Sequence, residues 1–381
     1  MYNKLGDFMN VGIICEYNPL HFGHLLHIKK IKEMYPNCNI ILVISGWITQ
    51  RGELSLIDKY KKCEIALNSG ADLVIEIPFK FMQSADYFAK GAIGILNKLK
   101  VNTIVFGSES NNIDKLYSLA RAQINNNLDI KKYLSKGDNY PTALARTLKE
   151  KTNIHVNTPN DLLGISYIKE ILKNNYNIKI NTIKRESNYN SKIIEGKITS
   201  STSIREALKN NKDIKDYVPD YEYKYLKNCL FIDDYFNYLK YKIISSNDIT
   251  IYQGVDKVLE NRIRKQILKS NTLDELIQNI KSKNYTYNRI KRTLTFILLS
   301  ITKKDCNNYD INYIKVLGFN NKGKKILNCI KKDIDIPIIT KFNPKYESKS
   351  LEIVKILSLN DKIKDKDKFI QLEYKTNIIK K

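Results

Sequence analysis

The sequence predicts an α/β fold, with a doubly wound parallel sheet in its first part and a mainly α-helical region after it. Two features of the chain predict this. Over the first 110 residues, short apolar runs alternate with longer amphipathic segments, which is the pattern of parallel strands joined by crossover helices. Beyond about residue 212 no such alternation is evident, and the segments have the character of basic amphipathic helices.

The apolar runs have the length of buried strands, and the segments between them have helical periodicity. In chain order the predicted strands are VGIIC (11–15), IILVIS (40–45), DLVIEIP (72–78), TIVFG (103–107) and INTIKRES (180–187). Helices are predicted at 25–35, 55–70 and 84–99, and the second of these ends at Gly70. Polar helical structure is predicted within 111–150, and the loop at 198–210 opens a further helix. Basic helices are predicted at 260–268 and 287–301. Sheets of this kind bind ligands beyond the carboxyl ends of their strands, so the loops that follow the strands are the candidate site.

Charge divides the chain into two parts. The formal net charge is +24, yet residues 1–110 carry 12 Lys and Arg against 10 Asp and Glu, so nearly all of the excess lies further on. A basic region beside a balanced one predicts a polyanionic partner, nucleic acid first, and an AT-rich genome is the competing explanation. We expect an N-terminal tail (1–8), an α/β domain (9–212) and a basic helical domain (213–381).

Several classes of protein are disfavoured by the sequence. The six cysteines are scattered without a CxxC pair, which argues against a disulfide framework and a zinc ribbon. No signal peptide and no apolar run of membrane-spanning length is evident. The expected location is the cytoplasm, with reduced thiols.

The stretch EYNPLHFGHLLHIKK (16–30) contains three of the four histidines, His21, His24 and His27. A strand, a turn, Gly23 and then a helix form a geometry that directs free backbone N–H groups and a helix dipole at an anion. Histidines at the mouth of that helix can donate hydrogen bonds to phosphate oxygens. A metal site with Cys15 and Glu16, or histidines that only pack the loop, are the alternatives. No G-K-[ST] follows, so this is not a P-loop.

A second loop points to the same ligand. TSSTSIR (199–205) is dense in hydroxyl groups and ends in Arg205 at a predicted helix start. It is either an N-cap cluster or a lid that binds the outgoing β- and γ-phosphates. Arg51, the pair Lys184 and Arg185, and Asn160 are further candidates, each of which could equally be a surface or turn residue.

Together these motifs resemble a known family. H-x-G-H after the first strand with a distal S-x-T-x-I-R is the pattern of nucleotidyltransferases related to class I aminoacyl-tRNA synthetases. The resemblance extends over most of residues 9 to 345, where successive blocks are similar to those of the bacterial tRNA(Met) cytidine acetate ligases. The blocks are VGIICEYNPLHFGHLLHI, SGWITQRGE, EIPFKFMQSADYFAKGAIGIL, TIVFGSES, PNDLLGISY, IKRE, TSSTSIRE, YTYNRIKRTLTFILLSI and YIKVLGFNNKGKKIL.

The resemblance implies a Rossmann-like nucleotidyltransferase domain that activates acetate with ATP as acetyl-adenylate and then acetylates the wobble cytidine of elongator tRNA(Met). It implies catalytic roles for His21, His24 and Arg205. The ATP contacts it implies are Ile14, Cys15, Glu16, Tyr17, Asn18, Pro19, Leu20, His21, Phe22, Gly23, His24, Leu25, Leu26, His27, Gly107, Asn160, Arg185, Ser201 and Thr202. Arg289, Lys291 and Arg292 form a basic stripe suited to tRNA, or a solvated helix face. Mg²⁺ is expected to arrive with the phosphates and not to have a dedicated protein site. No obligate protein partner of the chain is inferred.

The chain departs from the family pattern at a few positions. Leu20 and Phe22 stand where the family usually has Phe and Asn, Leu54 where Pro is expected and Asp161 where Asn is common. Trp47 replaces an expected Asn, and a reshaped acyl pocket is the expectation there.

Two other functions compete with the ligase. A small-molecule adenylyltransferase would join AMP to a phosphorylated cofactor precursor, but such enzymes are usually much shorter and lack a basic second half. A non-catalytic RNA-binding protein would carry the same charge, but it would not need His21, Gly23, His24 and Arg205 all intact.

Overall fold

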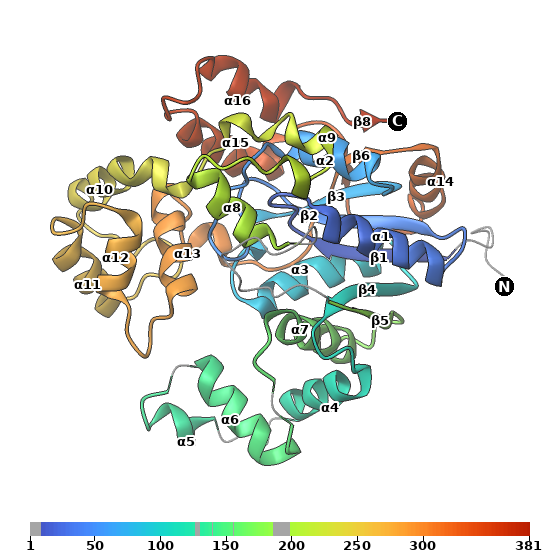
Figure 1. Ribbon diagram of the computed structural model, residues 1–381, viewed down its shortest axis with the longest axis horizontal. Helices are drawn as coiled ribbons and strands as arrows, with labels where there is room; N and C mark the ends of the chain where they lie inside the picture. Colours follow the sequence, from blue (N-terminus) through green and yellow to red (C-terminus); the bar gives the residue numbers. More distant parts are fainter. Residues whose placement is uncertain (1–8, 126–129, 139, 155, 186–198) are drawn as a thin grey trace.

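The structure is a computed structural model that describes residues 9–125, 130–138, 140–154, 156–185 and 199–381 (Figure 1). The expected tail, residues 1–8, lies outside the described residues. An eight-stranded sheet forms the centre, in the order β5-β4-β1-β2-β3-β6-β7, with β8 also paired to β6. The strands are β1 Asn10–Cys15, β2 Asn39–Ser45, β3 Leu73–Ile77, β4 Thr103–Ser108, β5 Lys179–Lys184, β6 Ile314–Phe319, β7 Ile338–Ile339 and β8 Ile379–Lys380.

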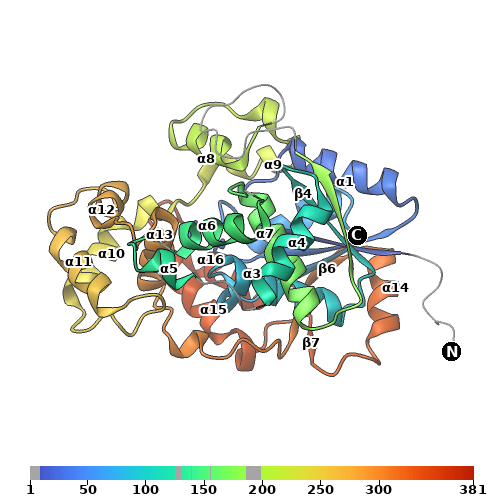
Figure 2. The same cartoon turned by 90° about the horizontal axis from the view of Figure 1, so that it is seen from below.

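The first five strands are parallel to one another, which confirms the predicted α/β class. Helices cover both faces of the sheet (Figures 1 and 2). Strand β2 shows the alternation of a strand buried on both faces, since Ile40 and Leu42 pack with α1 and α2, whereas Ile41 and Val43 pack with α3. The helices of this part are α1 Phe22–Met34, α2 Lys59–Asn68, α3 Ala85–Lys98, α4 Ile113–Ile124, α5 Lys131–Leu134, α6 Tyr140–Thr152, α7 Pro159–Lys173, α8 Ser201–Lys209 and α9 Asp220–Tyr223.

The second half is mainly helical, as expected, but it also contributes strands to the central sheet. Helices α10–α13 form a lobe beside the sheet, at the left of Figure 1. The chain then returns as β6, which pairs antiparallel with β3, and ends as β8 against β6. The helices of this half are α10 Phe236–Ser245, α11 Lys257–Ile267, α12 Leu273–Ile280, α13 Tyr287–Leu298, α14 Asn321–Ile330, α15 Pro344–Leu357 and α16 Lys366–Lys375.

The expectation that no strand follows residue 212 is therefore wrong. Strand β6 was missed because Lys315 interrupts its apolar run, although this lysine is only 3% exposed and its ammonium pairs with Glu347 at 2.8 Å. Helix α7 was also not predicted, although Pro159 at its first turn is a common helix start.

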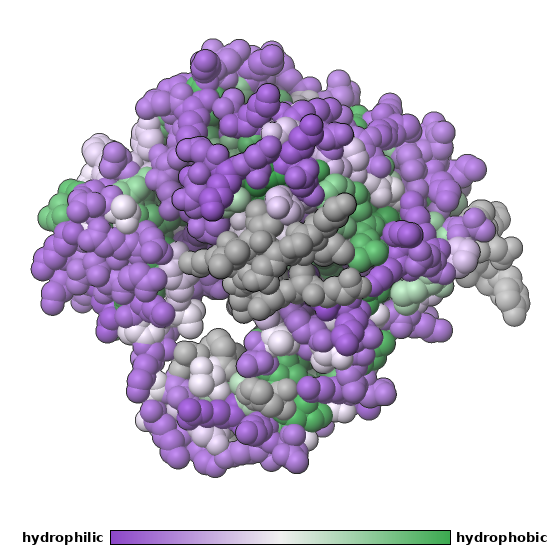
Figure 3. All heavy atoms as spheres, in the orientation of Figure 1, coloured by the Kyte–Doolittle hydropathy of each residue, from purple (hydrophilic) through white to green (hydrophobic). Residues whose placement is uncertain are grey.

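Hydrophilic residues predominate on the face seen in Figure 3, including the α10–α13 lobe. No helix in the described ranges has both the length and the apolar character needed to cross a membrane.

Candidate active site

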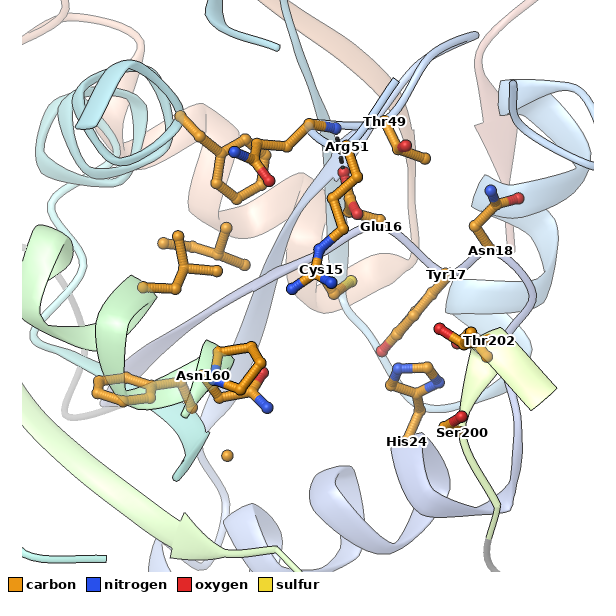
Figure 4. A pocket seen from close by; sticks show the side chains of 18 of the residues that line it. Cys15, Glu16, Tyr17, Asn18, His24, Thr49, Arg51, Asn160, Ser200 and Thr202 are labelled. Atoms are coloured by element: carbon orange, nitrogen blue, oxygen red, sulfur yellow. Dashed lines mark hydrogen bonds between the residues drawn. The ribbon is translucent and has the colours of Figure 1, made fainter. Parts of the chain in front are cut away.

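A cavity of about 610 Å³ opens at the carboxyl ends of the parallel strands. Residues of β1, β4 and β5 line it together with the loops and helix starts that follow them, and so do residues from the start of α13 (Figure 4). This is the position that a doubly wound sheet predicts for its ligand. In Figure 4, Arg51 and Glu16 lie side by side, His24 and Thr202 lie at one side of the space, and Asn160 lies at the other.

The first wall is the start of α1. His21 is its N-cap, and the His21 Nδ1 atom accepts a hydrogen bond from the Gly23 N–H at 3.1 Å. His24 Nδ1 accepts in the same way from the His21 N–H at 3.2 Å. Because a neutral imidazole carries one proton, both rings must carry it on Nε2, where it is free to be donated to a ligand. The two ring centroids lie 3.9 Å apart.

Burial and nearby arginines keep these histidines neutral. Burial, followed by the charges of Arg185 and Arg205, lowers the pKa of His21 from 6.5 to about 3. Burial and the charges of Arg185 and Lys30 lower the pKa of His27 to about 4, and burial places the pKa of His24 well below 6.5. His27 Nε2 is buried and has no hydrogen-bond partner among the described residues, as expected of a group that faces a ligand.

We expect the imidazole resonances of His21, His24 and His27 not to titrate between pH 5 and pH 8. The unfolded chain binds these protons near pH 6.5, whereas the folded chain binds them only near pH 3 to 4 at His21 and His27. The contribution of these side chains to the free energy of unfolding therefore decreases as the pH falls below 6.5. NMR of the imidazole Cε1–H signals measures this directly, and a midpoint near 6.5 for any of the three would contradict it.

The second wall is the start of α8, which lies against the loop after β1. Ser200 is the N-cap of α8, with Ser203 completing a capping box, so part of the N-cap alternative holds. The Ser201 hydroxyl donates to the Pro19 carbonyl at 3.1 Å, and Arg205 Nη1 donates to the Asn18 carbonyl at 2.7 Å. Two helix N-termini, 179 residues apart in sequence, thus line one cavity, and both carry partial positive charge toward it.

The third wall is the loop 46–55 between β2 and α2, which we call the pocket loop. Its residues Thr49, Gln50, Arg51 and Glu53 line the cavity. The Gln50 N–H donates to Glu16 Oε1 at 2.6 Å, and Gln50 Nε2 donates to the Gln83 carbonyl at 2.8 Å. Burial raises the pKa of Glu16, although the Gln50 N–H and the charge of Arg51 act against this. The sequence predicts this loop as part of the site from its place after the second strand, and Arg51 is the candidate ligand in it; Thr49, Gln50 and Glu53 were not predicted.

The fourth wall comes from β4, β5 and the start of α7. A Cβ atom at Gly107 would meet the Arg185 side chain at 3.1 Å, so the glycine allows Arg185 to lie close to the strand. Asn160 Nδ2 donates to Glu109 Oε1 at 2.6 Å. Apolar side chains complete this wall, and they were not predicted. They are Phe88, Phe106, Leu162, Leu163 and Tyr167.

Asp161, where Asn was expected, joins the start of α7 to the end of β4 behind this wall through hydrogen bonds. The carboxylate is 1% exposed and accepts hydrogen bonds from the Ser108 hydroxyl on one oxygen and from the Ser110 N–H and Thr158 hydroxyl, both at 3.0 Å, on the other. An asparagine has only one acceptor oxygen, so it could not accept on both sides. The aspartate at this position therefore makes hydrogen bonds that the usual asparagine could not make.

Most of the predicted catalytic and ATP-binding residues come together in this cavity, and four of them do not line it. Pro19, Leu20, Phe22 and Leu25 point elsewhere, and Leu20 is fully buried in the core. Those that line it are Ile14, Cys15, Glu16, Tyr17, Asn18, His21, Gly23, His24, Leu26, His27, Gly107, Asn160, Arg185, Ser201, Thr202 and Arg205.

The three cations of α13 do not form one exposed stripe. Arg289 lines the cavity with a side chain that is 43% exposed. Arg292 also lines it and donates to the Gln50 carbonyl at 3.1 Å. Lys291 is only 6% exposed, and its ammonium lies 2.5 Å from Glu53 Oε1. The stripe prediction failed at Lys291 because helical spacing turns it toward the pocket loop.

Trp47 does not line the cavity, so the expected change to an acyl pocket does not arise from direct contact. Within the described ranges, no group of three or more His, Cys, Asp or Glu side chains is arranged to hold a metal ion.

Comparison with known proteins places this site in a family. A family model described as HIGH nucleotidyl transferase matches residues 9–378. The tRNA(Met) cytidine acetate ligase of Clostridium novyi is 40% identical over 377 residues, covering 91% of this chain and 93% of that protein. The chain belongs to the tRNA(Met) cytidine acetate ligase family.

Other members of the family agree in length and fold. The Caldicellulosiruptor saccharolyticus ligase is 37% identical and covers 97% of this chain and 98% of its own length. The crystal structure of Thermotoga maritima TmcAL in its apo form I has a TM-score of 0.90 at 26% identity, covering 98% of this chain and 99% of that one. A second T. maritima TmcAL structure, with a TM-score of 0.86, is bound with alpha-thio ATP.

Proposed function

We propose that this chain is an ATP-dependent ligase that activates acetate as acetyl-adenylate and transfers the acetyl group to the wobble cytidine of elongator tRNA(Met), giving N4-acetylcytidine. The observation that carries the proposal is the convergence of two helix N-termini, with His21, His24 and Arg205, on one cavity at the carboxyl ends of the strands. Membership in the family supports the choice of reaction.

In this proposal ATP lies across the cavity. The apolar side chains of the fourth wall suit the adenine ring, with Phe106 and Leu162 as examples. The starts of α1 and α8 suit the phosphates, because their N–H groups and dipoles favour anions. Mg²⁺ would enter on the β- and γ-phosphates. Glu16, a carboxylate that lines the cavity, accepts the Gln50 N–H at 2.6 Å on one oxygen.

In the first step an oxygen of acetate attacks the α-phosphorus, and the bond to pyrophosphate breaks. Acetate is already ionised at neutral pH, so this step needs charge stabilisation more than a base. The Nε2–H groups of His21 and His24 and the guanidinium of Arg205 supply it. Because the histidines are neutral, they donate hydrogen bonds without repelling the two arginines beside them.

In the second step the exocyclic amine of cytidine attacks the acetyl carbon, and AMP leaves. The acceptor must approach the cavity from the side that the nucleotide leaves open. The start of α13 forms a rim there, with Thr286, Asn288 and Arg289 lining the cavity. We assign this rim to the RNA, with Arg289 and Arg292 as its cations and with Lys291 excluded by its ion pair to Glu53.

A small-molecule adenylyltransferase is less well supported, since α13 of the basic half forms part of the cavity and the relatives of full length are ligases.

The test measures the nucleoside product. The purified protein is incubated with ATP, isotopically labelled acetate and total bacterial tRNA, and the digested RNA is analysed by mass spectrometry. We expect labelled N4-acetylcytidine with the native chain. Pyrophosphate release without labelled RNA would retain the adenylating site and reject the acceptor, and absence of both would reject the proposal.

A further inference from the structure

The pocket loop is held both at its ends and at its centre. Lys62 of α2 is buried, and its ammonium donates to the Ser45 carbonyl at 2.7 Å and to the Ser55 hydroxyl at 3.1 Å. These bonds join the two ends of the loop. Gln50 and Arg51 line the cavity near the loop's centre, where the Gln50 N–H donates to Glu16 and the Gln50 carbonyl accepts from Arg292. Trp47 of the same loop does not line the cavity, and its contacts are with another part of the chain.

Trp47 binds the pocket loop to the end of the chain. Its side chain is 6% exposed, and the indole Nε1–H donates to Glu373 Oε2 at 2.9 Å. Its ring centroid lies 5.4 Å from that of Phe369. Both partners belong to α16, the last helix of the chain. The loop that lines the ATP cavity on one side is thus bound by a C-terminal helix on the other.

Glu373 is held by a buried network of charges. Its Oε1 atom lies 2.7 Å from the Lys59 ammonium, which also pairs with Glu76 of β3 at 2.8 Å. The Tyr60 hydroxyl donates to the Glu373 carbonyl at 3.2 Å. Burial alone would lower the pKa of Lys59, but the two carboxylates raise it well above its usual value. Both oxygens of Glu373 are therefore occupied, one by α2 and one by the pocket loop.

This network carries the docking of α16. All ten residues of α16 are described, and Glu373, at 1% exposure, is the one that is buried. Phe369 is partly buried and packs against the core, but no apolar side chain of α16 is fully buried, so the hydrophobic contribution to docking of this helix is limited. A buried ion pair adds little net stability compared with apolar packing, but it fixes orientation. We therefore expect the contacts of Glu373 to fix where α16 lies more than they stabilise the fold.

We propose that α16 is a latch that positions the pocket loop for nucleotide binding, with Glu373 as a positioning residue that acts through Trp47. This inference rests on the proposed function in that the positioned groups, Gln50 and Arg51, belong to the ATP site. Loss of the latch loosens the loop and weakens ATP binding, while His21, His24 and Arg205 keep their places. The effect appears in the KM for ATP and little in kcat.

The test uses Trp47, the chain's single tryptophan, as its own reporter. In Glu373→Gln the neutral amide weakens the bond to Lys59, and we expect red-shifted fluorescence and a dissociation constant for ATP about tenfold higher than native. Trp47→Phe keeps the pair with Lys59 but removes the bond to the loop, and we expect a similar rise in the KM for ATP in acetate-dependent ATP–pyrophosphate exchange. Asp367→Asn, an exposed change on the same helix, is the matched control.

The outcomes separate the latch from the reaction. If Glu373→Gln only lowers the melting temperature, with native ATP affinity and native Trp47 emission, the latch is rejected and the role is structural. If Glu373→Gln does not fold, native KM for ATP in Trp47→Phe rejects the latch. ATP binding is measured without acetate or RNA, so it does not depend on the proposed reaction. A native chain that binds ATP but forms no acetyl-adenylate would reject the proposed function. A difference in ATP affinity between the native chain and the variants would still support the latch.

Discussion

Replacing His24 with alanine is expected to lower the rate of acetyl-adenylate formation by about 10²- to 10³-fold, the range for loss of one preorganised donor to developing charge. The His24 ring lies at the mouth of α1, and its Nδ1 is occupied by the His21 N–H, so Nε2–H is the group that is lost. Acetate-dependent ATP–pyrophosphate exchange measures this step without RNA. We expect kcat to fall while the KM for ATP changes little, since the interaction strengthens in the transition state.

The control for His24→Ala is Lys29→Ala on the same helix. The Lys29 side chain is 73% exposed, so this change alters α1 without touching the cavity, and native exchange rates are expected. Labelled N4-acetylcytidine should disappear in His24→Ala and persist in Lys29→Ala. A native exchange rate in His24→Ala would remove this histidine from the proposed chemistry.

Replacing Lys291 with methionine is expected to reduce the free energy of unfolding by about 3 kcal/mol, because it leaves the largely buried Glu53 carboxylate without its cation. The Lys291 and Glu53 side chains are 8% and 18% exposed, and they join α13 to the pocket loop. Thr295 strengthens the same junction by donating to the Gly52 carbonyl at 2.7 Å. Chemical unfolding at neutral pH measures the loss.

A matched double variant decides whether the Lys291 effect comes from the pair. Glu53→Leu with Lys291→Met replaces both charges with apolar groups, and we expect most of the lost stability to return. If the double variant is as unstable as Lys291→Met, packing rather than charge explains the loss.

The pair also predicts a pH dependence of stability. Burial opposes ionisation of Glu53, but Lys291 and then Arg205 lower its pKa below 4.5. Because the folded pKa is the lower one, the contribution of Glu53 is present above pH 4.5 and is lost as the pH falls below it. The difference in unfolding free energy between the native protein and Lys291→Met should therefore shrink on acidification, and an unchanged difference at pH 3 would contradict this.

The sequence predicted what local pattern determines. The alternation of apolar runs with amphipathic segments predicted β1 to β5, and the H-x-G-H stretch after β1 predicted the α1 side of the cavity. Long-range structure was out of reach. Nothing near Lys315 shows that this lysine meets Glu347 across the protein interior, so β6 could not be recognised. Likewise, nothing in GWITQRGE shows that Glu373 binds Trp47 from 326 residues away.

The placement of individual side chains at the site also depends on long-range structure. A contiguous ATP stretch from Ile14 to His27 included Leu20, which helical and loop geometry turn into the core. The basic spacing of α13 suggested one RNA-facing stripe, but periodicity alone does not tell which face of a helix is covered. Only the position of the pocket loop reveals that Lys291 is covered.

The late return of β6 to the sheet has a consequence for the newly made chain. Strand β3 ends at residue 77, and its second neighbour begins at residue 314, so most of the protein is synthesised while one side of β3 has no partner. Exposed strand edges invite pairing with other chains, and a charge within the strand is a common protection. Glu76 places such a charge within LVIEI. In the folded protein the same carboxylate pairs with Lys59, so one side chain meets the needs of both stages.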